Sequence, residues 1–175
     1  MVVDVLQHDN ETTTHYTAQD ILDSLHAVKD PEIPAISVVD MGIITGVQLT
    51  NNNVHVSMTP TFVGCPAINV MRDEVEATVR GLGFRNVVVD VNFDQPWTTN
   101  RVTEAGKAAL LLHGLAPPDY IEESMSLKLD VLNNIACPVC HSRDTTLKTP
   151  FGPTLCRSIH HCNACHETFE AFKPV

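Results

Sequence analysis

Two Cys-x-x-Cys motifs near the C-terminal end constrain the fold more than any other feature of this chain. One spans Cys137 to Cys140 and the other Cys162 to Cys165, and 21 residues separate them. Each motif turns the backbone so that its two sulfurs converge, and two such turns supply the four ligands of one tetrahedral metal site. We therefore expect a zinc ribbon with one structural zinc ion, held by Cys137, Cys140, Cys162 and Cys165.

The segment between the two motifs has strand-like ends and a Gly/Pro-rich centre, which predicts a hairpin. A tetrathiolate site with this spacing also binds iron, so the spacing leaves zinc and iron open. A thioredoxin-type redox motif occurs once in a strand–helix–strand unit, and the paired arrangement disfavours it. Cys156 is left over and is expected to be a packed thiol, whereas nearby histidines such as His160 are expected at the surface.

Cysteine content and charge divide the chain into two parts. Five of the six cysteines lie in the last 39 residues, which favours metal binding over disulfides in a reducing compartment. The net charge is -10, with +1 on residues 134–175 and -11 on the rest. This acidic balance disfavours nucleic acid and anionic lipid as partners, and no apolar run approaches the ~20 residues of a membrane helix. Because the first residues also lack the pattern of a secretory signal, we expect a cytoplasmic protein.

The first part of the chain has the periodicity of a small α/β domain. Thr17 can cap a helix that must end before Pro31, and Asn51 to Asn53 can form the turn of a hairpin. The order helix–strand–strand–helix–strand predicts an α/β class, a sandwich of helices packed on a sheet. The expected elements are a helix over 17–30, strands over 43–49 and 54–58, a helix over 67–81, a strand over 86–93 and a helix over 102–112.

These patterns predict four segments. Residues 1–15 are polar and are expected to be a flexible tail, and residues 16–115 form the α/β domain with its C-terminal helix. Residues 116–132 contain adjacent prolines and an acidic run, which indicates a linker. A small C-terminal zinc-ribbon domain occupies residues 133–175. A segment of about 40 residues buries too little apolar surface to fold alone, so the metal should supply most of its stability.

A second candidate site surrounds Cys65, which lies just before the helix predicted over 67–81. The positive end of a helix dipole favours the thiolate, which is the better nucleophile and metal ligand. Asp30 and Glu32 lie in a proline-bracketed turn, where two interpretations stay open. They are solvated turn residues beside a packed thiol, or one or both join Cys65 in a mixed oxygen and sulfur site for iron. No general base is identified near Cys65, so we expect no thiol enzyme.

The residues around both sites resemble the iron–sulfur assembly domain family that includes SufT, followed by the extension found in the PaaD (PaaJ) family of phenylacetate degradation. The extension matches from Cys137 onward. Met41 stands where this family usually has leucine, which is a conservative exchange. The other matching segments are DPEIP from Asp30 to Pro34, DMG from Asp40 to Gly42, residues 59–66 ending in Gly-Cys-Pro, and PWT from Pro96 to Thr98.

The resemblance implies a function that composition and spacing do not show. Members of the PaaD family are encoded with the phenylacetyl-CoA epoxidase, a multicomponent di-iron oxygenase with an iron–sulfur flavin reductase. A non-catalytic maturation factor is implied, in which Cys65, helped by Asp30 or Glu32, receives or passes iron or a transient iron–sulfur cluster. Its partner is the oxygenase or the reductase, and the zinc ribbon docks that partner. The alternative is a structural, non-catalytic subunit of the oxygenase complex.

A single thiolate cannot hold a cluster tightly, because clusters normally take four protein ligands. The site around Cys65 is therefore expected to be shared, either across a homodimer or with the client protein.

Overall fold

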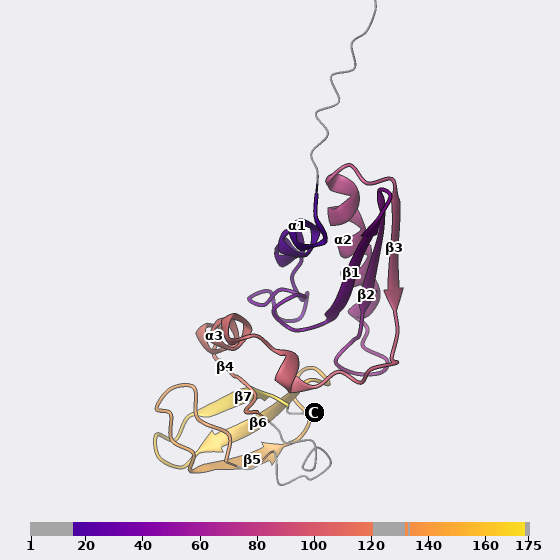
Figure 1. Cartoon of the computed structure of the whole chain (residues 1–175). Coiled ribbons are helices and arrows are strands. Elements are labelled where there is room, and N and C mark those ends of the chain that lie inside the picture. The colour runs from indigo at the N-terminus through magenta and orange to yellow at the C-terminus, as the bar shows by residue number, and fades with distance from the viewer. Residues whose placement is uncertain (1–15, 121–131, 133, 174–175) are drawn as a thin grey trace, which may run out of the picture.

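The computed structural model describes residues 16–120, 132 and 134–173. The flexible tail predicted over residues 1–15 lies outside the described residues, as does the part of the predicted linker over 121–131. Two sheets organise the chain, and Figure 1 shows them in two regions joined near α3. Within the described part, no helix combines the length and the apolar character needed to cross a membrane.

The first region follows the predicted order of helix, strand, strand, helix and strand, so the α/β class is confirmed. Its elements are α1 (Ala18–Ser24), the 3-10 helix η1 (Leu25–Ala27), β1 (Ile44–Thr50), β2 (Asn53–Met58), α2 (Ile68–Gly81) and β3 (Asn86–Val91). The sheet order is β1-β2-β3, in which β1 and β2 are antiparallel and β2 and β3 are parallel. Because parallel neighbours need a crossover, α2 connects β2 to β3 and packs with α1 against the sheet (Figure 1).

Local sequence explains where these elements begin. Thr17 caps α1 through a capping box, in which its side-chain oxygen accepts from the backbone N–H of Asp20 and the Asp20 carboxylate accepts from the backbone N–H of Thr17. The β1–β2 hairpin turns at Asn51 and Asn52, which both have the positive φ that a two-residue type I′ turn requires. α2 begins at Ile68, one residue later than the pattern predicts.

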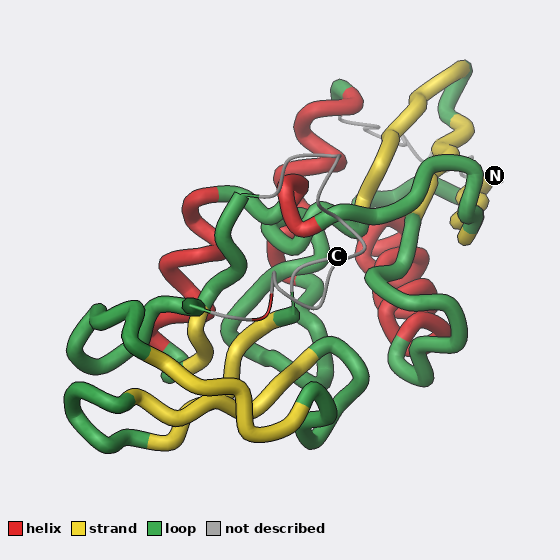
Figure 2. Tube along the Cα trace, turned by 90° about the horizontal axis from the view of Figure 1, so that it is seen from below, coloured by secondary structure: helices red, strands yellow, loops and turns green. Residues whose placement is uncertain are grey.

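The second region contains the zinc-ribbon motifs. Its elements are the 3-10 helix η2 (Thr99–Arg101), α3 (Glu104–Leu112), β4 (Leu115–Ala116), β5 (Thr145–Thr149), β6 (Arg157–Cys162) and β7 (Thr168–Phe172). The sheet order is β4-β7-β6-β5, and the hairpin predicted between the two motifs is the antiparallel pair β5–β6. β4 pairs with β7, so the chain enters this sheet at residue 115, just before the predicted linker. Figure 2 shows the two groups of strands with loops between them.

A shared core joins the two regions. Phe172, at the end of β7, is buried in the same apolar cluster as the side chains of α1, α2 and the first sheet. Its ring lies 5.9 Å from that of Trp97, measured between centroids, and the indole N–H of Trp97 donates to the backbone carbonyl of Met41 at 3.0 Å. Trp97 therefore anchors the junction between the two regions.

The Asp40-Met41-Gly42 segment has a structural role in this junction. The Asp40 carboxylate accepts hydrogen bonds from the hydroxyls of Ser37 at 2.6 Å and Thr103 at 2.9 Å, which ties the entry to β1 to the start of α3. Gly42 has a φ of 69°, and a β-carbon there would lie 2.5 Å from that of Arg101. Only glycine meets both conditions, so this turn depends on it.

Candidate metal centre and interdomain cavity

The four motif cysteines converge at one end of the ribbon sheet. Their sulfurs all lie within 4.8 Å of one another, with 3.5 Å between Cys140 and Cys162 and 3.7 Å between Cys137 and Cys165. A zinc–sulfur distance of about 2.3 Å in a tetrahedron gives sulfur separations of about 3.8 Å, so the geometry fits one ion. The backbone N–H of Cys165 lowers the pKa of the Cys162 thiol to about 7. The backbone N–H of Glu167 lowers the pKa of the Cys165 thiol, but hydrogen bonds to the neighbouring sulfurs and burial outweigh it and raise that pKa to about 12, so Cys162 ionises before Cys165.

The two cysteine motifs share one backbone construction. The residue after each motif is a histidine with positive φ, 61° at His141 and 64° at His166. Its backbone N–H donates to the carbonyl of the first cysteine of its own motif, at 2.9 Å in both cases. Both histidines therefore close a turn that brings two sulfurs together. Among the described residues, the group with metal-binding geometry consists of the four cysteines alone.

The expectation that the histidines near the motifs are surface groups is wrong for His160. Its side chain is fully buried, because alternate residues of β6 face inward and His160 shares that face with Ser158 and Cys162. Its ring stacks on Phe169 with 5.6 Å between centroids, and Nε2 lies 2.9 Å from the Ser158 hydroxyl. Burial lowers the pKa of His160, which is consistent with a neutral side chain in the ribbon core.

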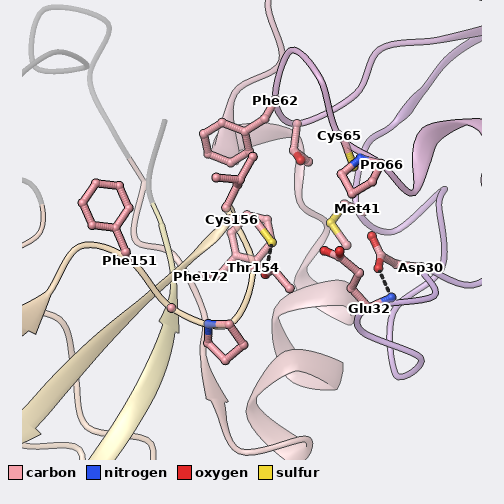
Figure 3. Close-up of a pocket in the computed structure, with 14 residues that line it drawn as sticks. Asp30, Glu32, Met41, Phe62, Cys65, Pro66, Phe151, Thr154, Cys156 and Phe172 are labelled. Carbon is pink, nitrogen blue, oxygen red and sulfur yellow. Dashed lines mark hydrogen bonds between the residues drawn. The ribbon is translucent and has the colours of Figure 1, made fainter.

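A cavity of about 270 Å³ lies between the two regions. The first region contributes Asp30, Glu32 and Cys65 to its wall, and the ribbon contributes Phe151 and Cys156. Figure 3 shows that these side chains come from facing loops. The structure thus brings the three predicted residues of the second site into one cavity, although their role with iron stays a prediction.

Cys65 lies in the loop that leads into α2, and its side chain is half-buried. Burial raises the pKa of the Cys65 thiol, the negative charges of Glu32 and Asp30 raise it further, and backbone N–H groups at the start of α2 only partly oppose this. The expectation that the helix terminus makes Cys65 a thiolate is therefore wrong for the metal-free protein. α2 begins three residues later, and burial together with the nearby carboxylates outweighs the helix dipole.

Asp30 forms the turn that one interpretation predicts, but it is buried rather than solvated, and its part in an iron site stays a prediction. It is buried, and its Oδ1 accepts the backbone N–H groups of Glu32 at 2.7 Å and Ile33 at 3.0 Å, so it forms the turn. The same side chain lines the cavity with Cys65. Burial raises the pKa of Asp30, and its hydrogen bonds and the charge of Arg157 oppose that rise.

Contacts between the regions hold the cavity together. The guanidinium of Arg157, at the start of β6, donates to the backbone carbonyl of Glu32 in the acidic turn. The ammonium of Lys173 lies 5.4 Å from the centre of the Phe62 ring and 5.8 Å from that of Phe151, one ring from each region. The two walls are therefore joined by polar and aromatic contacts.

Cys156 is the residue of this cavity that sequence reasoning missed. It is buried, as expected of a packed thiol, but it lies in the cavity wall contributed by the ribbon, facing the loop of Cys65 (Figure 3). The hydroxyl of Thr154 lies 3.0 Å from its sulfur. No local pattern could reveal this position, because Cys156 lies 91 positions after Cys65 in the chain.

Comparison with known proteins matches both regions. A family model described as PaaD zinc beta ribbon domain matches residues 123–173, and one described as iron-sulfur cluster assembly protein matches residues 18–91. An Escherichia coli (strain K12) protein, provisionally named as a subunit of 1,2-phenylacetyl-CoA epoxidase, is 32% identical over 151 residues, which cover 86% of this chain and 89% of the relative. That match is long enough to include both regions.

Two further likenesses cover about half of the chain. An Fe-S protein maturation auxiliary factor of Porphyromonas gingivalis is 34% identical over 90 residues, which cover 50% of this chain and 85% of the relative. The crystal structure of a domain of unknown function from Bacillus anthracis gives a TM-score of 0.50 at 28% identity, and covers 53% of this chain and 90% of that one.

Proposed function

This chain belongs to the PaaD family, in which an iron–sulfur cluster assembly domain is joined to a zinc ribbon, and from that premise we propose that it is a maturation factor for the phenylacetyl-CoA epoxidase. In this role the protein delivers iron or an iron–sulfur cluster to a component of the enzyme, either the oxygenase or its iron–sulfur flavin reductase. The protein itself does not oxidise phenylacetyl-CoA. The proposal is supported by the names of two relatives. One is named as an epoxidase subunit, which supports the link to the epoxidase, and the other as an Fe-S protein maturation auxiliary factor, which supports the role in maturation.

The observation that carries this proposal is the cavity that contains Cys65 together with Asp30 and Glu32. A thiol is a soft ligand and carboxylates are hard ligands, and iron accepts both. Because its pKa is raised, the Cys65 thiol keeps its proton until a metal ion displaces it. The protonated thiol is therefore a weak nucleophile, and it becomes a strong ligand only when iron arrives.

The ribbon metal has a different role in this proposal. Four cysteines complete a tetrahedron, so the ion has no open position for substrate, and we assign it as structural zinc. Zinc there stabilises the sheet whose loops form one wall of the cavity. The ribbon thus positions the second wall and presents a surface to the client protein.

Activation of the epoxidase tests the role of Cys65. Cys65→Ser should abolish activation of metal-depleted epoxidase components by the purified full-length protein, while zinc content and thermal unfolding stay as in the wild type. Val63→Ser changes an exposed side chain of the same loop and serves as the matched control, with normal activation expected. Normal activation by Cys65→Ser would refute the proposed role of Cys65 in handling iron.

A structural subunit of the oxygenase complex is the second candidate, favoured by the word subunit in the name of the Escherichia coli relative. It requires a stable complex with the other components at fixed stoichiometry. Co-purification from cells that express all components distinguishes the two candidates. A one-to-one complex that survives size exclusion favours the subunit, whereas loss of the protein after activation favours the maturation factor.

A further inference from the structure

We propose that Cys156 is a second sulfur ligand in the cavity of Cys65, so that this site offers iron two thiolates together with the carboxylates of Asp30 and Glu32. This inference rests on the proposed iron-handling function of Cys65 and names the ligand set that performs it. Its substrate is ferrous iron, or the [2Fe–2S] cluster in which each iron takes two protein ligands.

The backbone fixes Cys156 at the cavity wall. Gly152 turns the preceding loop back onto β6, and its N–H donates to the carbonyl of Arg157 at 2.9 Å. A β-carbon on Gly152 would lie 2.8 Å from that of Arg157, so this close approach needs glycine. On the other side, the carbonyl of Cys156 accepts from the backbone N–H of Lys173 at 2.8 Å. Contacts on both sides thus hold the thiol in a rigid segment.

The surroundings of Cys156 differ from those of a thiol that only fills space. Asp30 and Glu32 line the same cavity, and the negative charge of these two carboxylates acts on Cys156 as it does on Cys65. Burying a carboxylate beside uncharged thiols costs free energy unless a positive charge compensates it. Arg157 offers part of that compensation from the backbone side of the turn. A cation held between the thiols and the carboxylates would supply the rest.

A second thiol adds a protein ligand to the single one that Cys65 supplies. Two thiolates satisfy one iron of a [2Fe–2S] cluster, and the other iron is left for ligands of the client protein. Each thiol releases one proton to solvent as its sulfur binds iron, so binding of ferrous iron liberates two protons from the two cysteines and changes no oxidation state.

The cavity differs from the ribbon site in how far it is preformed. Within the described ranges, the ribbon cysteines are the one group of three or more metal-ligating residues with all donor atoms within 4.8 Å. Side chains in the cavity must therefore turn inward around an iron ion. Such a site suits a metal that is passed on, whereas the closed tetrahedron of the ribbon suits a metal that stays.

Iron X-ray absorption spectroscopy counts the sulfur ligands directly. The full-length, zinc-loaded protein is given ferrous iron alone in one arm, and ferric iron with inorganic sulfide in the other, both without oxygen. The first arm should show two sulfur neighbours per iron in the wild type and one in Cys65→Ser or Cys156→Ser. In the second arm, labile sulfide and the cluster absorption should be lost in both variants. Lys148→Ala changes an exposed residue of β5 that does not line the cavity and should behave as the wild type.

The outcomes separate this inference from the function on which it rests. If Cys65→Ser loses iron and activation while Cys156→Ser retains both, Cys156 is not an iron ligand and the proposed function stands. If Cys65→Ser also retains both, the proposed function fails as well. The wild-type spectrum in the first arm needs no variant to fold, and a single sulfur neighbour there overturns the inference by itself.

Discussion

The two regions of this protein are stabilised by different physics. The first has a large core of aliphatic side chains from α1, α2 and the sheet, with Ile21, Val56 and Val75 fully buried. The separate core of the ribbon contains Ala116, Ile135, Cys137, Cys162, Phe169 and Ala171, and two of these, Cys137 and Cys162, belong to the four-cysteine group that could hold a metal ion. Apolar burial therefore suffices for the first region, whereas we expect the ribbon to depend on a metal ion.

The two regions depend on each other at the junction between them. Phe172 and Cys156 belong to the ribbon by sequence, yet they are buried in the core that the two regions share and not in the separate core of the ribbon. The candidate iron site lies at the same junction. Ribbon residues such as Phe151 and Cys156 line the cavity of Cys65, so the fold of the ribbon contributes to the shape of that site.

Removal of the ribbon metal should separate the regions most clearly. Cys162→Ser should lose the zinc and with it about 10 kcal/mol of folding free energy in the ribbon, because a structural zinc site stabilises by that order. Hydrogen exchange should show β5, β6 and β7 unprotected while β1, β2 and β3 stay protected. Cys156→Ser, a ribbon cysteine outside the tetrahedron, should keep its zinc. Protected ribbon strands in metal-free Cys162→Ser would show that the ribbon does not need a metal ion to fold.

The contact between the regions can be broken without touching either core. Arg157→Met keeps the apolar stem but removes the guanidinium that bonds the carbonyl of Glu32 and, at 2.8 Å, the carboxylate of Glu170. The Arg157 side chain is only 13% exposed, so its loss should lower the free energy of unfolding by about 3 kcal/mol with zinc content unchanged.

Urea unfolding measures this change, and Arg143→Met is the matched control. Arg143 forms an ion pair with Asp119 in which both side chains are 58% exposed. Because solvent screens such a pair, its loss should cost less than about 1 kcal/mol. Equal effects of the two substitutions would show that Arg157 does not join the regions.

Asp40→Asn should weaken the first region by about 2 kcal/mol at pH 7, since it removes hydrogen bonds to a charged group. Burial would raise the pKa of Asp40, but hydrogen bonds from Ser37 and Thr103 hold it below the ordinary 3.8. The stabilisation is therefore fully present above pH 3.8 and is lost as the pH falls through the lower pKa of the folded state.

The pH dependence of urea unfolding checks this sign. The difference in unfolding free energy between the wild type and Asp40→Asn should shrink as the pH falls below 3.8. Asp94→Asn, an exposed control in the same region, should match the wild type throughout. A difference that grows in acid would refute the assignment.

The smallest expected effect concerns the cavity itself. Glu32→Gln removes one negative charge near Cys65, so the pKa of the Cys65 thiol should fall and more thiolate should be present at pH 8. Alkylation of Cys65 by iodoacetamide, followed by mass spectrometry, should become about threefold faster, which corresponds to half a pKa unit. Glu104→Gln changes an exposed side chain of α3 and should leave the rate unchanged. An unchanged rate in Glu32→Gln would place its charge outside the reach of Cys65.

Features that depend on near neighbours in the chain could be predicted from the sequence. The spacing of the Cys-x-x-Cys motifs predicted that the four sulfurs converge, because each turn is made by its own five residues. The capping box at Thr17 and the asparagine turn of the β1–β2 hairpin were equally local. The burial of His160 could have been inferred from the alternation of side chains along β6. His160 lies two residues before Cys162 and therefore shares its face, which points inward.

The sequence alone thus determined the α/β class, the order of its elements and the ribbon cysteines, since capping, periodicity and ligand spacing act over a few residues. Only the tertiary structure decided that Cys65 and Cys156 line one cavity, because docking of the ribbon brings together loops 91 residues apart. It also reversed the expected ionisation of Cys65. Desolvation and the charges of nearby carboxylates depend on three-dimensional packing, and at this site they outweigh the helix dipole on which the prediction relied.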